Sequence, residues 1–210
     1  MSPNRLPASY FENMYADAED PWSFTTRWYE QRKRALTLAA LPNPRYRNAF
    51  EPGCSIGTLT EHLATRCDRI LATDLVSKPL ETAAARLRRD PGNGRATVEF
   101  RVWALGDDWP AESFDLIVLS EVCYYLDRDA LPAAIERAAA HLEPGGTLLG
   151  VHWRHPVPDY PLTGDEVHDI IATEPRLSRL AAYRDDDLRL EVYTTSEPAP
   201  RSVAQQAGLV

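Results

Sequence analysis

A carboxylate stands directly before a run of small residues in the segment Glu51-Pro52-Gly53-Cys54-Ser55-Ile56-Gly57. Glycine and other small residues let a backbone approach a bound ligand closely. The N–H groups of a helix that begins near Thr58 would attract an anion. The negative charge of Glu51 nevertheless disfavours a polyanion at this turn. The pattern therefore favours a ligand that carries positive charge.

A second carboxylate, Asp74, ends the apolar run 69–73 and lies about twenty residues after Gly53. At this spacing, nucleotide-binding βαβ units carry an acid for the ribose hydroxyls. The dinucleotide fingerprint G-x-G-x-x-G is not met, because Thr58 occupies the place of its third glycine. We expect the strands that end at Glu51 and Asp74 to lie side by side.

The elements that must position these groups alternate between strands and helices from Glu51 onward, which predicts an α/β fold with a parallel sheet. We expect strands near 48–51, 69–74, 97–102, 114–120 and 146–152, and helices near 58–66, 78–89, 129–142 and 164–173. Turns at Gly92-Asn93-Gly94 and Pro144-Gly145-Gly146 feed the third and fifth strands. The β-rich runs 177–183 and 188–194 predict a final antiparallel hairpin.

The N-terminal region is rich in aromatic residues. Phe11, Met14 and Tyr15 follow helical spacing and predict a short amphipathic helix. A second helix is expected over about 26–41, with Trp28, Leu36 and residues 38–41 as its apolar face. These helices either pack on the core or form a lid over the ligand turn. The tail from Ser196 shows no clear pattern.

Composition narrows the class of protein. The chain has 210 residues, enough for one domain with a full core, and a formal net charge of −8, which disfavours a nucleic-acid partner. No apolar run reaches the length of a membrane span, and the first residues do not precede a signal-peptide core. Three cysteines without C-x-x-C spacing indicate neither a zinc site nor a disulfide framework. We expect a cytoplasmic protein without a metal.

Three motifs resemble those of class I S-adenosylmethionine (SAM) dependent methyltransferases. The Glu51–Gly57 segment is similar to their E/D-x-G-x-G-x-G motif, with Ser55 in place of the middle glycine. Residues 114–126 resemble the motif of their fourth strand, and residues 142–148 resemble the L-x-P-G-G-x-L turn. Within this class, Asp20-Pro21-Trp22, residues 152–155 and residues 162–167 look like the nodulation protein S group, and the resemblance covers about residues 10 to 195.

The resemblance implies a three-layer Rossmann-like sheet of five parallel strands plus the C-terminal hairpin. It also implies an N-terminal helical lid over residues 1–45, a SAM-binding core over 46–195 and a tail over 196–210.

The resemblance also implies residues for SAM and for its product S-adenosylhomocysteine (SAH). Glu51 would hold the ammonium group of the donor, Asp74 would accept from the ribose hydroxyls, and Leu75 would lie against the adenine. Trp103 and Ala104 stand where many relatives carry an aspartate for the adenine amino group, so its recognition must come from backbone or from elsewhere. Trp103 either covers the adenine edge or only packs. The implied donor-binding residues are Trp22, Lys33, Glu51, Gly53, Cys54, Ser55, Gly57, Thr58, Leu59, Asp74, Leu75, Trp103, Ala104, Ser120, Glu121 and Val122.

The acceptor should bind beyond the ends of the fourth and fifth strands, where open α/β sheets bind ligands. We expect His152 or Glu121 to stabilise or remove the acceptor proton and Tyr124 to orient the acceptor nitrogen. Histidine is the best base by pKa, near ~6.5 when unperturbed. Alternatively, His152 only satisfies a backbone partner. The expected acceptor-binding residues are Tyr124, Tyr125, His152, Trp153 and His155.

The resemblance implies a SAM-dependent methyltransferase, because the named member of the nodulation protein S group N-methylates the free amino group of a deacetylated chitooligosaccharide. We therefore expect N-methylation of an amine on a sugar or a related small polar metabolite, by a monomer or a homodimer. Three alternatives remain open: methylation of a hydroxyl with the same donor, a nicotinamide-dependent oxidoreductase, and a SAM-binding protein without turnover.

Overall fold

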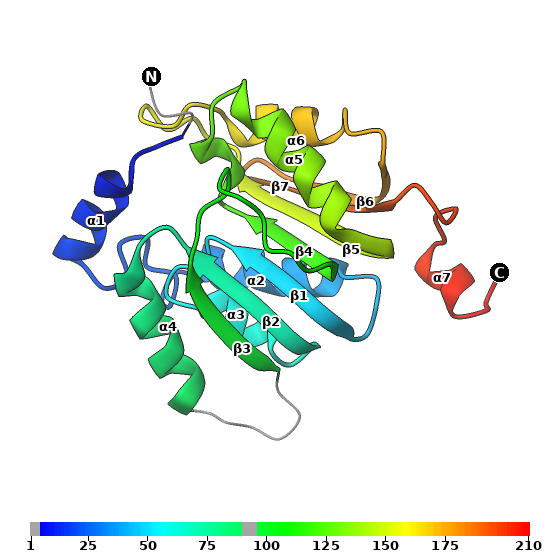
Figure 1. Ribbon diagram of the computed structural model, residues 1–210, viewed down its shortest axis with the longest axis horizontal. Helices are drawn as coiled ribbons and strands as arrows, with labels where there is room; N and C mark the ends of the chain where they lie inside the picture. The colour runs from blue at the N-terminus through cyan, green and yellow to red at the C-terminus, as the bar shows by residue number, and fades with distance from the viewer. Residues whose placement is uncertain (1–4, 90–95) are drawn as a thin grey trace.

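The computed structural model describes residues 5–89 and 96–210, and within these ranges it shows one mixed seven-stranded sheet (Figure 1). Neighbouring strands follow the order β3-β2-β1-β4-β5-β7-β6. Strands β1 to β5 are parallel, and β7 is antiparallel to both β5 and β6. The predicted parallel series with a terminal hairpin is confirmed, whereas the predicted turn Gly92-Asn93-Gly94 lies outside the described residues. The strands are β1 (Tyr46–Pro52), β2 (Cys67–Asp74), β3 (Thr97–Val102), β4 (Phe114–Ser120), β5 (Leu142–Trp153), β6 (Leu177–Arg184) and β7 (Leu188–Thr195).

Helices cover both faces of the sheet (Figure 1). The core on one face includes side chains of α5 and α6, and the core on the other includes side chains of α3 and α4. No helix in the described part of the chain has both the length and the apolar character needed to cross a membrane. The helices are α1 (Ala8–Asp17), α2 (Trp28–Ala40), α3 (Thr58–Leu63), α4 (Ser77–Arg89), the 3₁₀ helix η1 (Cys123–Tyr125), α5 (Ala130–His141), α6 (Gly164–Ile171) and α7 (Val203–Gln206).

Strand residues alternate between the two cores. In β1, Ala49 belongs to the core beside α3 and Phe50 to the core beside α5, and in β4, Leu116 and Ile117 divide in the same way. Both faces are covered, so these strands are almost continuously apolar. Because the strands are parallel, their carboxyl ends meet at one edge of the sheet, where polar residues begin.

The chain leaves β1 through a tight turn that needs left-handed backbone angles. Gly53, Ser55 and Gly57 have φ values of 72°, 50° and 74°. Glycine adopts this region freely, whereas Ser55 does so at a cost of about 1–2 kcal/mol. Gly57 is the N-cap of α3, and a Cβ built there would lie 2.8 Å from the Cβ of Ala83 in α4. The turn therefore combines close backbone approach at Gly53 with close packing of α3 on α4 at Gly57.

The second N-terminal helix packs Leu36, Leu38 and Leu41 against the core as predicted, but not Trp28. Trp28, expected on the apolar face of α2, is 73% exposed. The residues that α2 buries are Glu30, Lys33 and Thr37. The expectation for Trp28 is wrong because α2 turns charged side chains toward the polar carboxyl ends of the strands. In α1, by contrast, Phe11 and Tyr15 are buried as their spacing predicts.

Beyond β7 the chain leaves the sheet and ends in the short helix α7, which lies at the side of the molecule in Figure 1. None of the residues of α7 is buried. This segment therefore contributes little to the core.

We expect Gly57→Ala to destabilise the protein more than Gly145→Ala. Both glycines have a positive φ (74° and 77°), but a Cβ at position 145 meets no atom within 4 Å. Gly145→Ala is therefore the control, and it measures backbone strain alone, about 1–2 kcal/mol. The Gly57 variant adds overlap with Ala83, which should cost at least about 1 kcal/mol more. Urea unfolding of both variants measures the difference, and equal losses would contradict tight packing of α3 on α4.

Candidate active site

A cavity of about 460 Å³ lies at the carboxyl ends of the parallel strands and is lined in part by the N-terminal segment. A second cavity of about 50 Å³ shares Lys33, Gly53, Ser55 and Glu121 with it. The predicted site residues that line one or both cavities are Trp22, Lys33, Glu51, Gly53, Cys54, Ser55, Thr58, Leu59, Asp74, Leu75, Trp103, Ala104, Ser120, Glu121, Val122, Tyr124, Tyr125 and Trp153.

Glu51, at the end of β1, lines the smaller cavity and is only 3% exposed. Its Oε2 atom has no hydrogen-bond partner among the described residues. Burial raises the pKa of Glu51 to about 8, because a charged carboxylate loses its hydration without gaining a cation. An ammonium group in the smaller cavity would supply the missing charge and the missing hydrogen bond.

Asp74, at the end of β2, lines the larger cavity. Its Oδ1 accepts from the backbone N–H of Val76 at 3.1 Å and its Oδ2 from that of Ser55 at 3.0 Å. Burial raises the pKa of Asp74 to about 6, although these N–H groups oppose the change. Each carboxylate oxygen keeps a further lone pair, so Asp74 can also accept from two hydroxyl groups of a ligand.

Ser55 ties the turn to the N-terminal segment. Its hydroxyl lies 2.6 Å from that of Tyr15 in α1. The Nζ of Lys78, in α4, also donates to the backbone oxygen of Tyr15. A glycine at position 55 would lack the hydroxyl contact, so serine at the middle position of the motif connects α1 to the ligand turn.

Glu121 follows β4 in the left-handed region, with φ 56°. Its Oε1 accepts from the Nζ of Lys33 at 2.7 Å. Its Oε2 accepts from the backbone N–H of Trp153 at 3.0 Å and from the hydroxyl of Tyr124. Glu121 therefore joins α2, η1 and the end of β5 at one point of the cavity wall. A backbone strained in this way is typical of positions that carry function.

Lys33 also contacts Glu30, with Nζ 3.0 Å from Oε2 of that residue. Lys33 is 5% exposed and Glu30 is 7% exposed. Burial alone would lower the pKa of Lys33, but the carboxylates of Glu121 and Glu30 hold it above its ordinary value. Burial raises the pKa of Glu30. The cavity wall therefore carries a buried ammonium between two carboxylates.

Aromatic side chains form one end of the larger cavity. The Tyr124 and Tyr160 rings stack with centroids 4.8 Å apart, and Tyr125 packs edge-on against both. Trp153 packs edge-on against Tyr29 at 4.9 Å. The hydroxyl of Tyr29 is buried without a partner among the described residues. This end offers both ring faces and a free polar atom to a ligand.

Trp103 lines the opposite part of the cavity and also packs in the core. Its Nε1–H donates to the backbone oxygen of Asp108 at 2.8 Å, and its ring lies 5.2 Å from that of Phe50. The N–H of Ala104 donates to Asp107 at 3.1 Å. Covering a ligand and packing are therefore compatible at Trp103, while the N–H of Ala104 is already engaged.

The structure contradicts the expected role of His152 as a base. His152 is 0% exposed and does not line either cavity. Its Nε2 accepts from the backbone N–H of Cys123 at 3.3 Å, so the alternative interpretation, a satisfied backbone partner, is the one observed. Burial lowers the pKa of His152 well below its ordinary value.

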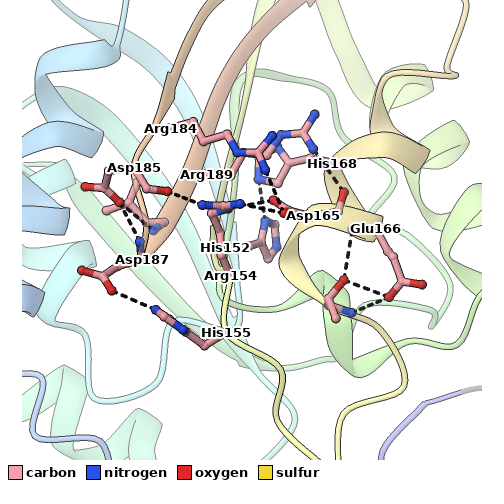
Figure 2. Close-up of polar contacts among 12 residues, drawn as sticks. His152, Arg154, His155, Asp165, Glu166, His168, Arg184, Asp185, Asp187 and Arg189 are labelled. Carbon is pink, nitrogen blue, oxygen red and sulfur yellow. Dashed lines mark hydrogen bonds and ion pairs between the residues drawn. The ribbon is translucent and has the colours of Figure 1, made fainter.

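Two other predicted site residues also lie away from the cavities. His155 lies outside the cavity lining and pairs with Asp187 at 2.9 Å on the surface (Figure 2). Gly57 contacts Ala83 of α4 rather than lining either cavity. His155 follows a strand that ends at Trp153, and Gly57 is the N-cap of α3. Neither residue therefore faces the cavities.

Sequence reasoning also missed residues that line the cavity. Glu30 and Tyr29 face it from α2, Tyr15 faces it from α1, and Tyr160 faces it from the segment after β5. Glu30 and Lys33 are spaced i, i+3 and carry opposite charges. This spacing was the available signal that the two side chains lie on one face of the helix. Tyr160 stands in a proline-rich segment without periodicity, and nothing in its neighbourhood in the sequence marks it.

Comparison with known proteins supports the fold. A methyltransferase domain family matches residues 50–148. A crystal structure of a putative methyltransferase from Pseudomonas syringae is 43% identical, covers 80% of this chain and 99% of that chain, and superposes with a TM-score of 0.67. The crystal structure of the N-methyltransferase NodS from Bradyrhizobium japonicum WM9 in complex with SAH is 25% identical, with 90% and 98% coverage and a TM-score of 0.78.

These matches show that the chain belongs to the class I, SAM-dependent methyltransferase family. Within this family it is similar to nodulation protein S. The nodulation protein S of Rhizobium tropici is 33% identical over 134 residues, which are 63% of this chain and 54% of that protein. The chain thus spans about half the length of this curated relative.

The carboxylates Glu51 and Asp74 fit a ligand that carries an ammonium group and vicinal hydroxyls, because Glu51 lacks a cation and Asp74 retains lone pairs. Within residues 5–89 and 96–210 no group of three or more His, Cys, Asp or Glu could hold a metal ion.

We expect the ligand-free protein to lose stability, relative to Glu51→Gln, as the pH rises from 5 to 8. The pKa of Glu51 is about 8 when folded and about 4.3 when unfolded. Its favourable contribution is therefore complete below about pH 4 and is lost as the pH rises through 8. Urea unfolding at pH 5, 6.5 and 8 measures this difference, with a limiting slope of about 1.4 kcal/mol per pH unit. Parallel curves for the two proteins would show that Glu51 ionises normally.

Proposed function

We propose that this protein transfers a methyl group from SAM to the amino group of a small polar acceptor, such as an amino sugar. The single observation that carries the proposal is the buried carboxylate of Glu51, whose Oε2 has no partner among the described residues, together with Asp74 at the next strand end. This pair suits the ammonium and the ribose of SAM. The similarity to the N-methyltransferase NodS, crystallised with SAH, supports both the donor and an amine acceptor.

Bound SAM would supply an electrophilic methyl group on a positively charged sulfur. In the transfer, the bond between carbon and sulfur breaks, a bond between carbon and the acceptor nitrogen forms, and that nitrogen loses a proton to solvent. The chain's contribution is to hold the two reactants in line at close approach, which supplies a large part of the acceleration in such displacements. Glu51, Asp74 and the Gly53 turn fix one reactant, and the aromatic end of the cavity fixes the other.

Tyr124 suits the orientation of an amine. Its hydroxyl proton is donated to Glu121, so its oxygen can only accept a hydrogen bond from the cavity. An acceptor N–H bound there leaves the nitrogen lone pair free to point toward the methyl group. Because both oxygens of Glu121 are engaged by Lys33, Tyr124 and Trp153, Glu121 holds Tyr124 in place rather than removing a proton.

An amine fits this site better than a hydroxyl. A neutral amine attacks without prior deprotonation, whereas a hydroxyl acceptor needs a base. Among the described residues that line the cavities there is no histidine, and the carboxylates of Glu30, which is buried, and Glu121, which is partly buried, are paired with Lys33. The observation supports N-methylation over methylation of a hydroxyl.

Isothermal titration of the purified protein with SAH, with NADH as the parallel control, tests the donor. We expect SAH alone to bind. Glu51→Gln and Asp74→Asn should each weaken SAH by about 10- to 100-fold, because each removes charged hydrogen bonds worth about 1.5–3 kcal/mol. Glu143→Gln, a surface carboxylate paired with Arg47, is the matched control and should bind normally.

Repeating the titration at pH 7 in buffers of different ionisation enthalpy gives a second readout. An ammonium beside Glu51 lowers the pKa of that residue, so wild-type protein should release protons on binding and Glu51→Gln fewer. Binding of NADH, or unchanged SAH affinity in both site variants, would contradict the donor assignment.

We expect Tyr124→Phe to lower kcat for an amine acceptor by about 10- to 100-fold while SAH affinity stays within twofold, because the lost oxygen orients the nitrogen. Steady-state kinetics with glucosamine-type amines and SAH titration measure the two effects. Tyr160→Phe keeps the stacked ring, and its hydroxyl lies 3.4 Å from Tyr125 rather than on Glu121, so its effect on kcat should be smaller. An equal loss in the two variants would remove the special role of Tyr124.

A further inference from the structure

Two buried histidines and a buried glutamate form a line beneath the acceptor end of the cavity. They are His152 in β5, His168 in α6 and Glu191 in β7, exposed by 0%, 0% and 2%. His152 Nδ1 lies 3.2 Å from His168 Nε2, and His168 Nδ1 lies 2.8 Å from Glu191 Oε2. Figure 2 shows the two histidines next to each other, and their rings are nearly perpendicular, at 81°. The functional roles described above do not use this line.

Hydrogen-bond chemistry allows only one arrangement of protons along it. The backbone N–H of Cys123 can only donate, and it points at His152 Nε2. His152 Nε2 is therefore bare and the proton of that ring sits on Nδ1, since a neutral imidazole has one donor and one acceptor. His152 then donates to His168 Nε2, and His168 donates from Nδ1 to Glu191. Every member of the chain is satisfied only when both imidazoles are neutral.

Burial favours the neutral state of His152. Together with the Lys33 ammonium, it keeps the pKa of His152 well below its ordinary value. Hydrogen bonds from His168 and Tyr193 outweigh burial and bring the pKa of Glu191 to about 2. Arg179, from β6, and Arg189, from β7, lie 2.8 Å and 3.2 Å from Glu191. The chain therefore ends on a permanently charged carboxylate.

The His152 end of this hydrogen-bonded line supports the acceptor site. Cys123 begins η1, which carries Tyr124, and the Tyr124 ring packs edge-on against the His152 ring at 5.4 Å. Trp153, next to His152 in β5, donates its backbone N–H to Glu121. Glu121 in turn accepts from the Tyr124 hydroxyl. A displacement of His152 would therefore reach both groups that orient the acceptor.

We propose that His152 and His168 are positioning residues. When both imidazoles are neutral, their hydrogen bonds hold η1 and Tyr124 in the position that orients the acceptor. A proton gained by the pair releases η1 and Tyr124 from this position. A proton on His168 Nε2 would point at the Nδ1–H of His152, which leaves two donors without an acceptor. If the His152 proton moved to Nε2 instead, it would point at the N–H donor of Cys123. Either outcome breaks one hydrogen bond of this line, so a proton gained by the pair weakens the support of the acceptor site.

Nitrogen-15 NMR of histidine-labelled protein tests the arrangement directly, and it does not depend on the proposed function. At pH 7.5 we expect both imidazoles to show a protonated Nδ1 and an unprotonated Nε2, with His152→Gln and His168→Gln used to assign the signals. On acidification the Cys123 amide should shift together with the imidazole signals. A protonated Nε2 on His152 at neutral pH, or a Cys123 amide that does not respond, would overturn the inference.

Kinetics test the positioning role, which rests on the proposed methyl transfer. His168→Gln cannot titrate, yet its amide can accept from His152 and donate to Glu191. We expect it to keep kcat at pH 8 within about threefold and to move the acid limb of the kcat profile to lower pH. His168→Leu leaves His152 unpaired and should lower kcat at pH 8 by about 10-fold or more, with SAH affinity retained.

His155→Gln is the matched control, because His155 is exposed and pairs with Asp187 outside the cavities. Its profile should equal that of the wild type. A His168→Gln profile identical to the wild type would overturn the positioning role. If no acceptor is methylated by wild-type protein, the proposed function fails, and the NMR arm still decides the proton arrangement.

Discussion

The ion pair between Lys33 and Glu121 is the contact on which the rest of the site depends. It joins α2, in the N-terminal segment, to the residue that ends β4, with 2.7 Å between Nζ and Oε1. Both side chains are largely buried, and a buried charge that loses its partner costs about 3–5 kcal/mol. The pair therefore fixes where the N-terminal segment lies over the strand ends. Glu121 also accepts from the Tyr124 hydroxyl, so the pair holds the group that orients this hydroxyl.

The carboxylates at the strand ends show that the site is arranged for a ligand rather than for stability. Burial raises the pKa values of Glu51 and Asp74 to about 8 and about 6, so both groups are destabilised as anions in the ligand-free protein. Ser55 and Glu121 add left-handed backbone strain. Such local costs are typical of binding sites, where a bound ligand compensates them. A cationic ligand at Glu51 would convert the largest of these costs into binding energy.

Much of the fold and of the donor side could be predicted because their signals are local. Alternating strand and helix patterns locate the sheet, and the positions of Glu51 and Asp74 at strand ends follow from its parallel topology. The acceptor side depended on contacts between distant segments. His152 follows Val151, a residue of the core beside α3, so strand alternation places it on the other face of the sheet, and His168 meets it there from α6. The prediction for Trp28 was wrong because α2 turns Lys33 inward to Glu121, a contact with a residue far away in the sequence.

Tyr124 in the cavity and the buried imidazoles behind η1 have different roles in the proposed methylation of an amine. Under the proposed function, an amine that binds in its neutral form already has a free lone pair, so the protein needs orientation more than it needs a base. The cavity offers such orientation through the Tyr124 oxygen, which is free only to accept. The imidazoles that a base mechanism would use are instead buried behind η1, where Cys123 determines their tautomers. The ligand space itself thus carries aromatic faces, carboxylates and a paired ammonium, which suit binding and orientation of the reactants.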